Sequence, residues 1–434
     1  MNKPKFSIFA LNFNHQRMVD KKILKDILTE NRDMVQNLRL EKRDFAFYDD
    51  FRYVLIGVRR AGKSFLLFQR MQELLSNGHS WDEMLYINFE DDRLLDFEAS
   101  DFNAILEVHA EMSGGTKPIL FLDEVQNITG WEKFARRLAD QKYVANITGS
   151  NAKMLSSDVA TTLGGRYLIL QVYPYDWNEY LMANGISGDC TVTPLFDEYM
   201  KYGGFPECAT LQGKKEYLLS VYQKIYLGDI ASRYNVENKT ALRLMFRKLA
   251  ESIMQPIALT RLTNILTSTG MKVSKNTILN YASYAKDAFL ILPIKNIADS
   301  FTERETNQKY YFVDNGIISL LTMDNKAAQL ENMIAVALFR KFGLEDNVYF
   351  YNYNVEVDFV VPDKSMAIQV CYDLGNDTSE TYLRETKALI NIAKRLQYTD
   401  LYIITYNEER EIEIDGMYIN VVPAHKWLFN IRKS

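Results

Sequence analysis

The sequence predicts an α/β protein built from a parallel sheet, a helical region and a second α/β domain, in that order. Short apolar runs alternate with helical patterns between residues 46 and 180, an order typical of a parallel sheet covered by helices. Helical spacing of apolar residues dominates residues 181–300. Strand and helix patterns alternate again in residues 301–434, so we expect a second sheet there.

The length supports a division into several domains. A chain of 434 residues exceeds what one core usually holds, since domains average roughly 100–200 residues. We expect a helical N-terminal segment in residues 1–45, because "ILKDILTENRDMVQNL" has apolar residues at helical spacing. Residues 46–180 then form the first α/β domain, residues 181–300 the helical region and residues 301–434 the C-terminal domain.

The composition bounds the class of protein. Hydrophobic residues make up 47% of the chain and charged residues 25%, as in globular proteins that fold in water. No apolar run approaches the ~20 residues that span a bilayer, and the N-terminus has no signal-peptide pattern. We therefore expect a cytoplasmic protein without a membrane partner.

Cysteine and histidine usage argues against two kinds of site. The three cysteines, Cys190, Cys208 and Cys371, lie far apart, and the four histidines are equally scattered. This spacing offers no disulfide framework and no Cys/His zinc site.

The first α/β domain contains a predicted phosphate-binding loop. Its expected strands are "RYVLIG", "EMLYINFE", "PILFLDE", "YVANITGS" and "RYLILQV". After the first of them, "GVRRAGKS" fits the pattern G-x-x-x-x-G-K-[ST], in which backbone N–H groups wrap phosphate oxygens. Lys63 would reach the β- and γ-phosphates of ATP, and the Ser64 hydroxyl would ligate Mg²⁺. The predicted nucleotide contacts of this loop are Gly57, Arg59, Arg60, Ala61, Gly62, Lys63, Ser64 and Phe65.

A pair of carboxylates follows the third predicted strand. In "KPILFLDEVQN" four apolar residues bring Asp123 and Glu124 to a strand end. Asp123 is expected to hold Mg²⁺, and Glu124 to act as the catalytic base that polarises the attacking water. Since "LYINFE" intervenes, the strand of Asp123 is not the next strand after the phosphate-binding loop.

Two further features of an ATPase site are predicted less specifically. "NITGSN" ends a strand in Ser150 and Asn151, where a polar side chain could sense the γ-phosphate, although either residue could simply cap the strand. The transition state also needs a cation against the transferred phosphoryl group. Arg166 in "LGGRYLIL" is the first candidate for this catalytic arginine, and Arg59 and Arg60 are the others.

These motifs resemble a known family. "GVRRAGKS", "YINFEDDRL", "FLDEVQNITGWE", "ITGSNAKML", "LGGRYLILQVYP", "YGGFPE" and "AIQVCYDL" together resemble the predicted AAA-type ATPases of bacteria and archaea whose C-terminal module is a domain of unknown function. The resemblance covers nearly the whole chain. It implies an N-terminal ATPase domain, a helical middle with a winged helix, and a C-terminal module related to PD-(D/E)XK nucleases.

Positive charge is concentrated in the helical region. Residues 239–296 contain nine Lys and Arg against two acidic residues, although the whole chain carries a formal charge of -5. The order "ALTRLTNIL", a turn at Gly270 and "SKNTILNYASYAKDAFLI" suits a winged helix. Its second helix would expose Lys275, Asn276 and Thr277 near Lys272, a composition that suits DNA as well as a packing or protein contact.

The stretch "VDFVVPDKSMAIQVC" near the C-terminus predicts a hairpin with an incomplete nuclease site. Asp358 is present, and Glu331 could supply a second carboxylate. Gln369 and Cys371 stand where such nucleases carry Glu and Lys, although Lys364 in the turn could replace the lysine. The sequence therefore favours a nuclease-like fold without nuclease activity.

Together these observations predict an ATPase that uses ATP and Mg²⁺ and acts as a nucleotide-gated switch. DNA and protein partners both remain open, as does the oligomeric state. The alternative is an ATP-regulated, metal-dependent nuclease.

Overall fold

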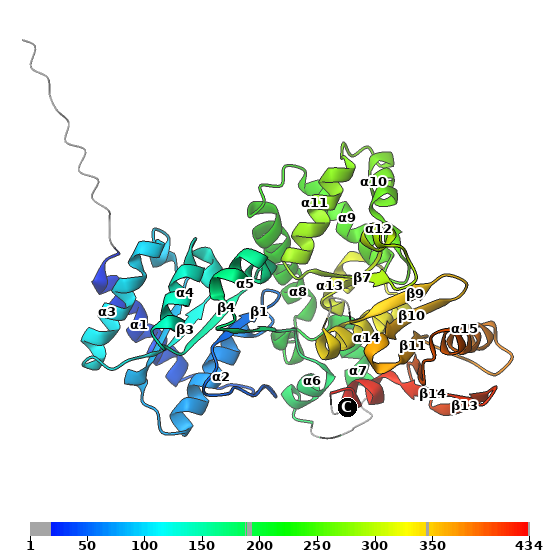
Figure 1. Ribbon diagram of the computed structural model, residues 1–434, viewed down its shortest axis with the longest axis horizontal. Helices are drawn as coiled ribbons and strands as arrows, with labels where there is room; N and C mark the ends of the chain where they lie inside the picture. Colours follow the sequence, from blue (N-terminus) through cyan, green and yellow to red (C-terminus); the bar gives the residue numbers. More distant parts are fainter. Residues whose placement is uncertain (1–18, 187, 189–192, 344–346, 433–434) are drawn as a thin grey trace, which may run out of the picture.

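The computed structural model describes residues 19–186, 188, 193–343 and 347–432. The first α/β domain lies at one end of the molecule, the helical region in the middle and a larger sheet at the other end (Figure 1). Cys190 and the first part of the N-terminal segment lie outside the described residues. Among the described residues, no helix is long and apolar enough to cross a membrane.

The first sheet is parallel, as predicted. Its strands have the order β2-β3-β4-β1-β5, so β4 separates the strand of Asp123 from the strand that leads into the phosphate-binding loop. All four residues of β1 are buried, which explains its continuous apolar sequence YVLI. The strands are β1 (Tyr53–Ile56), β2 (Met84–Asn88), β3 (Ile119–Asp123), β4 (Ala145–Gly149) and β5 (Leu168–Gln171).

Five α-helices accompany this sheet among the described residues. Asp20 caps α1, whose buried residues Leu24, Ile27, Leu28 and Val35 recur at helical spacing and pack toward α3 and β2. The helices are α1 (Lys21–Gln36), α2 (Lys63–Ser76), α3 (Phe102–Ser113), α4 (Trp131–Asp140) and α5 (Ser157–Leu163).

The middle of the chain is mostly helical, as predicted. It contains α6 (Trp177–Ala183), α7 (Thr193–Tyr202), α8 (Lys214–Gln223), α9 (Lys239–Glu251), α10 (Leu259–Ser268) and α11 (Lys275–Asp287). A π-helix, η7 (Lys224–Ser232), continues α8 directly. Wide helical turns of this kind are rare and often occur at functional sites.

The second sheet has nine strands in the order β13-β14-β12-β11-β10-β9-β7-β8-β6. Strands β6 and β7 come from before residue 301, so this sheet also receives the end of the helical region. Its strands are β6 (Ile257–Ala258), β7 (Ile291–Asn296), β8 (Asn307–Phe312), β9 (Tyr349–Asn352), β10 (Glu356–Val361), β11 (Met366–Val370), β12 (Asp400–Thr405), β13 (Arg410–Ile414) and β14 (Met417–Pro423).

Helices cover the second sheet and join it to the rest of the molecule. They are α12 (Phe301–Thr306), α13 (Asn315–Leu321), α14 (Lys326–Phe342), α15 (Glu380–Leu396) and α16 (Ala424–Asn430). The predicted hairpin is β10 and β11, paired antiparallel with Phe359 opposite Ile368. The last helix, α16, packs against α6 beside the first domain, so the end of the chain returns to the middle of the molecule (Figure 1).

Candidate nucleotide-binding site

The loop between β1 and α2 has backbone angles that favour glycine at both of its motif positions. Gly57 has φ +153° and Gly62 has φ +90°. A Cβ added at Gly57 would also lie 2.1 Å from the carbonyl oxygen of Val172. These two positions let the loop turn back over the start of α2, with its N–H groups at the helix N-terminus.

Lys63 is buried at the base of this loop. Its Nζ donates to the carbonyl oxygens of Gly57 and Val58, each at 3.1 Å. It also lies 3.4 Å from Glu124 Oε1. The ammonium is therefore held at the loop, beside the carboxylate that ends the motif on β3.

Asp123 is buried at the end of β3, where three hydroxyl groups bond its carboxylate. Tyr86 donates its hydroxyl proton to Asp123 Oδ2 at 2.8 Å, and the Thr148 hydroxyl donates to Oδ1. The Ser64 hydroxyl is a third hydrogen-bond partner of this carboxylate. Burial and the neighbouring charge of Glu124 raise the pKa of Asp123, whereas these three hydroxyl groups favour its anion.

Glu124 has a left-handed backbone, with φ +51°, and hydrogen bonds hold both its backbone and its side chain. Its N–H donates to Thr148 Oγ1 at 2.9 Å. Gln126 Nε2 donates to Glu124 Oε2 at 2.6 Å. Burial acts against ionisation, but Lys63 and the Gln126 amide outweigh it and lower the pKa of Glu124. The group is therefore a carboxylate at neutral pH.

The two polar residues after β4 differ in their surroundings. Ser150 is buried, and its hydroxyl accepts from Gln126 Nε2 at 3.3 Å next to the Glu124 carboxylate. The Asn151 side chain instead accepts from Lys153 N at 2.8 Å, as a local cap. Ser150 therefore lies among the predicted site residues, and Asn151 fits the alternative of a capping residue.

A cavity of about 460 Å³ opens over this loop. That volume lies within the range of small-molecule sites. Arg59, Arg60, Gly62, Lys63, Ser64, Phe65 and Glu124 line it, together with residues from the N-terminal segment and from Pro206 to Thr210. Gly57, Ala61, Asp123, Ser150 and Asn151 do not line it. Most of the predicted contacts thus meet at one cavity.

Two oxygen ligands suited to Mg²⁺ lie together at this site, and one of them, Ser64, lines the cavity. The Ser64 hydroxyl and the Asp123 carboxylate are in contact, and hard cations such as Mg²⁺ prefer such ligands. The residues therefore fit the predicted cofactor pair of ATP and Mg²⁺.

Arg166 lies at the wrong edge of the sheet to serve its own site. Leu168 pairs with Tyr53 at the start of β1, whereas the phosphate-binding loop follows the end of β1. Arg166, two residues before Leu168, bonds Asp140 at 2.7 Å. Arg166 therefore does not lie at the cavity of its own chain. Its role as the catalytic arginine stays a prediction.

The other two arginine candidates differ in their freedom. Arg59 forms a two-point ion pair with Asp229, at 2.8 and 3.0 Å, and also bonds Glu90. Arg60 is 62% exposed and lies 3.5 Å from Glu207. Of the two, only Arg60 has a side chain that can turn toward the cavity without breaking a buried ion pair.

Several residues around the site escaped the sequence prediction. Tyr86, Thr148 and Gln126 contact the two carboxylates, and Asp229 contacts the loop. Thr148 and Gln126 stand within two residues of predicted positions, so their spacing was the available signal. Tyr86 and Asp229 come from other elements and carry no local signal.

The predicted nuclease site contains a lysine that the sequence did not point to. Lys309 on β8 is fully buried, and its Nζ lies 3.5, 3.1 and 3.2 Å from Glu331, Glu356 and Asp358. Gln369 contributes its amide to the backbone instead, accepting from Asp358 N and donating to the Glu356 carbonyl.

The other nuclease-site candidates, Cys371 and Lys364, are not among the ion-pair partners of this cluster. Cys371 is buried, and burial raises its pKa above that of an ordinary thiol. Lys364 is exposed in the turn of the hairpin. In the part of the chain that the structure describes, no group of three or more His, Cys, Asp or Glu is arranged to hold a metal ion.

The fold and the site define an ATP-binding AAA protein. Residues 49–181 match the AAA domain family, which confirms the predicted AAA-type domain. Residues 193–328 match a domain of unknown function (DUF8612), which covers the helical region and the first strands of the second sheet. The predicted relation of the C-terminal module to nucleases stays a prediction.

Two relatives match nearly the whole chain. A protein of Methanocaldococcus jannaschii is 32% identical over 434 residues, covering 94% of this chain and 96% of its own. A protein of Haemophilus influenzae is 33% identical over 397 residues, covering 87% and 94%. Both are described as uncharacterized proteins. The chain belongs to the same family as these two proteins.

Similar solved structures are more distant. The Walker-type ATPase of Pyrococcus abyssi is 14% identical, covers 71% of this chain and 97% of its own, and has a TM-score of 0.39. The Orc1 protein of Aeropyrum pernix, solved in complex with DNA, is 14% identical, covers 73% and 92%, and has a TM-score of 0.29.

Proposed function

We propose that the protein hydrolyses ATP with Mg²⁺ and uses the bound nucleotide to control how the helical region and the C-terminal module are held. The observation that carries this proposal is that Lys63, Ser64 and Glu124 line one cavity and that the Ser64 hydroxyl is hydrogen-bonded to Asp123. A cation, a base and oxygen ligands for a metal are the groups that phosphoryl transfer to water requires.

In this proposal each residue has one role. Lys63 binds the β- and γ-phosphates, and Glu124 accepts the proton of the attacking water. Ser64 and Asp123 hold Mg²⁺, which neutralises charge on the phosphate oxygens when it is bound. Arg60 is the residue of this chain best placed to stabilise the transferred phosphoryl group.

The first link from the site to the rest of the molecule is the Arg59–Asp229 ion pair. Arg59 belongs to the phosphate-binding loop, and Asp229 belongs to the π-helix of the helical region. Both side chains are mostly buried, so movement of the loop would act directly on this helix. The pair thus supports a switch that responds to nucleotide.

The second link is a chain of buried charges. Arg43 donates to the loop carbonyl of Ala61 at 2.8 Å and forms a two-point ion pair with Glu179 on α6. Glu179 also accepts from Arg340 of α14 at 2.6 Å. The loop is therefore connected through three side chains to a helix that packs on the second sheet.

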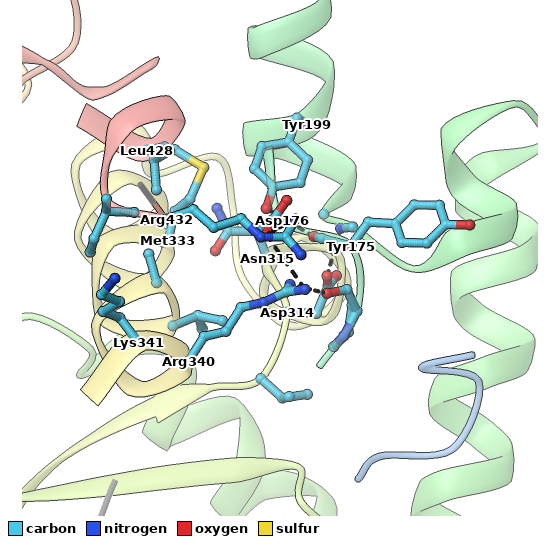
Figure 2. Close-up of a pocket in the computed structure, with 17 residues that line it drawn as sticks. Tyr175, Asp176, Tyr199, Asp314, Asn315, Met333, Arg340, Lys341, Leu428 and Arg432 are labelled. Carbon is cyan, nitrogen blue, oxygen red and sulfur yellow. Dashed lines mark hydrogen bonds and ion pairs between the residues drawn. The ribbon is translucent and has the colours of Figure 1, made fainter. Parts of the chain in front are cut away.

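Arg340 sits at a junction of three parts of the molecule. Figure 2 shows Arg340 and Arg432 extending toward Asp176, at 3.5 and 3.2 Å, beside a cavity of about 190 Å³. These contacts join α14 and the end of the chain to the linker before α6. A change in the loop that moved Glu179 would disturb this junction.

The test is ATP turnover by purified protein and by Glu124→Gln. We expect Mg²⁺-dependent phosphate release from the native protein and a loss of about 10²-fold or more in Glu124→Gln, since general bases contribute 10²–10⁴-fold. ATP binding measured by calorimetry should remain. Equal turnover by both proteins would remove Glu124 as the base.

A second candidate function is binding of duplex DNA by the helical region. The order α9, β6, α10, α11, β7 and β8, with β6 and β7 both paired to β8, supports a winged helix. Ser274 caps α11, and Lys272, Lys275 and Asn276 are exposed at its start. These side chains suit phosphate and base edges.

This second candidate has its own test. If DNA binds here, affinity should fall steeply with salt, and Lys272→Glu with Lys275→Glu should weaken it for all sequences. Absence of a duplex shift at low salt, with and without ATP, would favour a packing or protein-binding role for this region.

A further inference from the structure

Gln126 links the two sides of the proposed catalytic centre. Its Nε2 donates to Glu124 Oε2 at 2.6 Å and to Ser150 Oγ at 3.3 Å. Gln126 comes from the short helical turn after β3, and Ser150 follows the end of β4. One amide group therefore connects the residues that follow β3 with the residue that follows β4.

The same amide has an unsatisfied oxygen. Gln126 Oε1 is buried and accepts no hydrogen bond from any residue that the structure describes. The amide cannot simply be turned over, because its oxygen would then face the Glu124 carboxylate. A buried acceptor without a donor costs folding free energy. Stability alone therefore does not explain a glutamine at this position.

Space for this amide depends on Gly149. A Cβ added at Gly149 would lie 2.6 Å from Gln126 Oε1 and also overlap the sulfur of Met154. The backbone at the end of β4 thus leaves room for a side chain whose oxygen gains no hydrogen bond there. The hydrogen bonds of this amide are therefore made by Nε2 alone.

The Nε2 group of Gln126 acts against the attraction of the Glu124 carboxylate to Lys63. Lys63 Nζ lies 3.4 Å from Glu124 Oε1, whereas Gln126 holds Oε2. Without the amide, the carboxylate could rotate to place both oxygens against the ammonium. We propose that Gln126 is a positioning residue that holds the Glu124 carboxylate away from Lys63 and aligned with Ser150. The inference rests on the proposed ATP hydrolysis.

The test is Gln126→Met, which keeps the length of the side chain and removes its polar atoms. We expect kcat for ATP to fall about 10- to 100-fold, the range that a small misplacement of a reacting group produces. KM and the dissociation constant for ATP should stay within about twofold, because Gln126 does not line the cavity. The thermal midpoint should be unchanged or higher, since the unsatisfied oxygen is gone.

Two further variants make the result specific. Asn127→Ala is the matched control, because the Asn127 side chain bonds the Phe89 carbonyl. Only the Asn127 backbone N–H bonds Glu124, at its carbonyl oxygen, and alanine keeps that bond. The kcat of this variant should equal that of the native protein. In the Glu124→Gln background, adding Gln126→Met should cause no further loss, since Gln126 acts through Glu124.

The outcomes separate this inference from the proposed function. No ATP turnover by the native protein would overturn the proposed hydrolysis itself. Native turnover with an unchanged kcat in Gln126→Met would overturn only the role of Gln126. A fall in kcat accompanied by an equal loss of ATP affinity or by a lower thermal midpoint would assign Gln126 a structural role and also count against the inference.

Discussion

Two buried lysines beside carboxylates, Lys63 after β1 of the first sheet and Lys309 on β8 of the second, have surroundings that differ in kind. Lys63 is bonded to two loop carbonyls, lies 3.4 Å from one carboxylate oxygen and adjoins a cavity of about 460 Å³. Lys309 has no exposed surface and lies within 3.5 Å of Glu331, Glu356 and Asp358.

The two lysines differ in whether the ammonium group can still bind an added anion. Near Lys63 only Glu124 is charged and the other two partners are neutral carbonyls, so the ammonium can also bind an anion that enters the cavity. Near Lys309 the surrounding carboxylates outnumber the cation, so no positive charge remains for a ligand. The ammonium also occupies the space between side chains that could otherwise approach a metal ion. The site at Lys63 is therefore arranged to bind phosphate, whereas the Lys309 ammonium already occupies the carboxylates of the second site.

The largest expected effect is the loss of folding stability caused by Lys309→Met, and it tests the difference between the two lysines. Removing the ammonium leaves buried carboxylates without a partner, which costs about 3–5 kcal/mol when one member of a buried ion pair is lost. Hydrogen exchange in peptides from β8, α14 and β10 should speed up accordingly. Lys364→Met, in the exposed turn, is the control. Unchanged protection in Lys309→Met would mean that the cluster contributes little to the stability of this sheet.

The same substitution at the other lysine should affect ligand binding more than folding. In Lys63→Met the phosphates lose a charged hydrogen-bond donor, worth about 1.5–3 kcal/mol. ATP affinity measured by calorimetry should therefore fall roughly 10- to 100-fold. Lys133→Met, on the exposed side of α4, serves as the matched control. Native affinity in Lys63→Met would place the nucleotide elsewhere.

These two sites were not equally accessible to sequence reasoning. The loop containing Lys63 and the strand ending in Asp123 and Glu124 are local motifs, because phosphate and metal contacts come from adjacent residues in each segment. Fold class and the parallel sheet followed from the alternation of strands and helices. Those predictions needed no knowledge of which strands pair.

The contacts that the sequence did not predict depend on which elements, far apart in the chain, lie together. Lys309 meets Glu331 and Asp358 only because β8, α14 and β10 lie together, and its one signal was a lysine within the apolar run "KYYFV". Arg166 was chosen for its charge, but the register of β5 on β1 puts it at the opposite edge. Asp229 likewise contacts the loop from a remote helix, and Glu179 is connected to the loop through Arg43.

A smaller effect is expected from the pH dependence of the Lys309 cluster. Burial raises the pKa of Glu331, although Lys309 and the Tyr311 hydroxyl favour its anion. The folded state then keeps a proton that the unfolded state has lost above the ordinary glutamate pKa of about 4.3. Stability of this sheet should therefore fall as pH rises from about 4.3, by on the order of 1 kcal/mol per pH unit at most.

The variant Glu331→Gln isolates this contribution. Glutamine cannot titrate and still offers an oxygen to the Tyr311 hydroxyl, which bonds Glu331 at 2.7 Å. Hydrogen exchange in β8 and β10, corrected for its intrinsic pH dependence, should lose its slope between pH 5 and pH 7 in this variant. The same slope in both proteins would assign it to another group.

The smallest effect on ATP turnover is expected from Asp358→Ala. The same variant also tests whether the Lys309 site is inactive as a nuclease. Asp358 belongs to the Lys309 site, so ATP hydrolysis should stay within about twofold of the native rate. The native protein should not cleave single- or double-stranded DNA or RNA with Mg²⁺ or Mn²⁺, because Gln369 lacks the negative charge of a metal ligand and Lys309 already occupies the carboxylates. Metal-dependent cleavage that disappears in Asp358→Ala but survives Lys63→Ala would contradict this. The second site would then be a working nuclease, and Lys309 would have to leave its carboxylates to admit the metal.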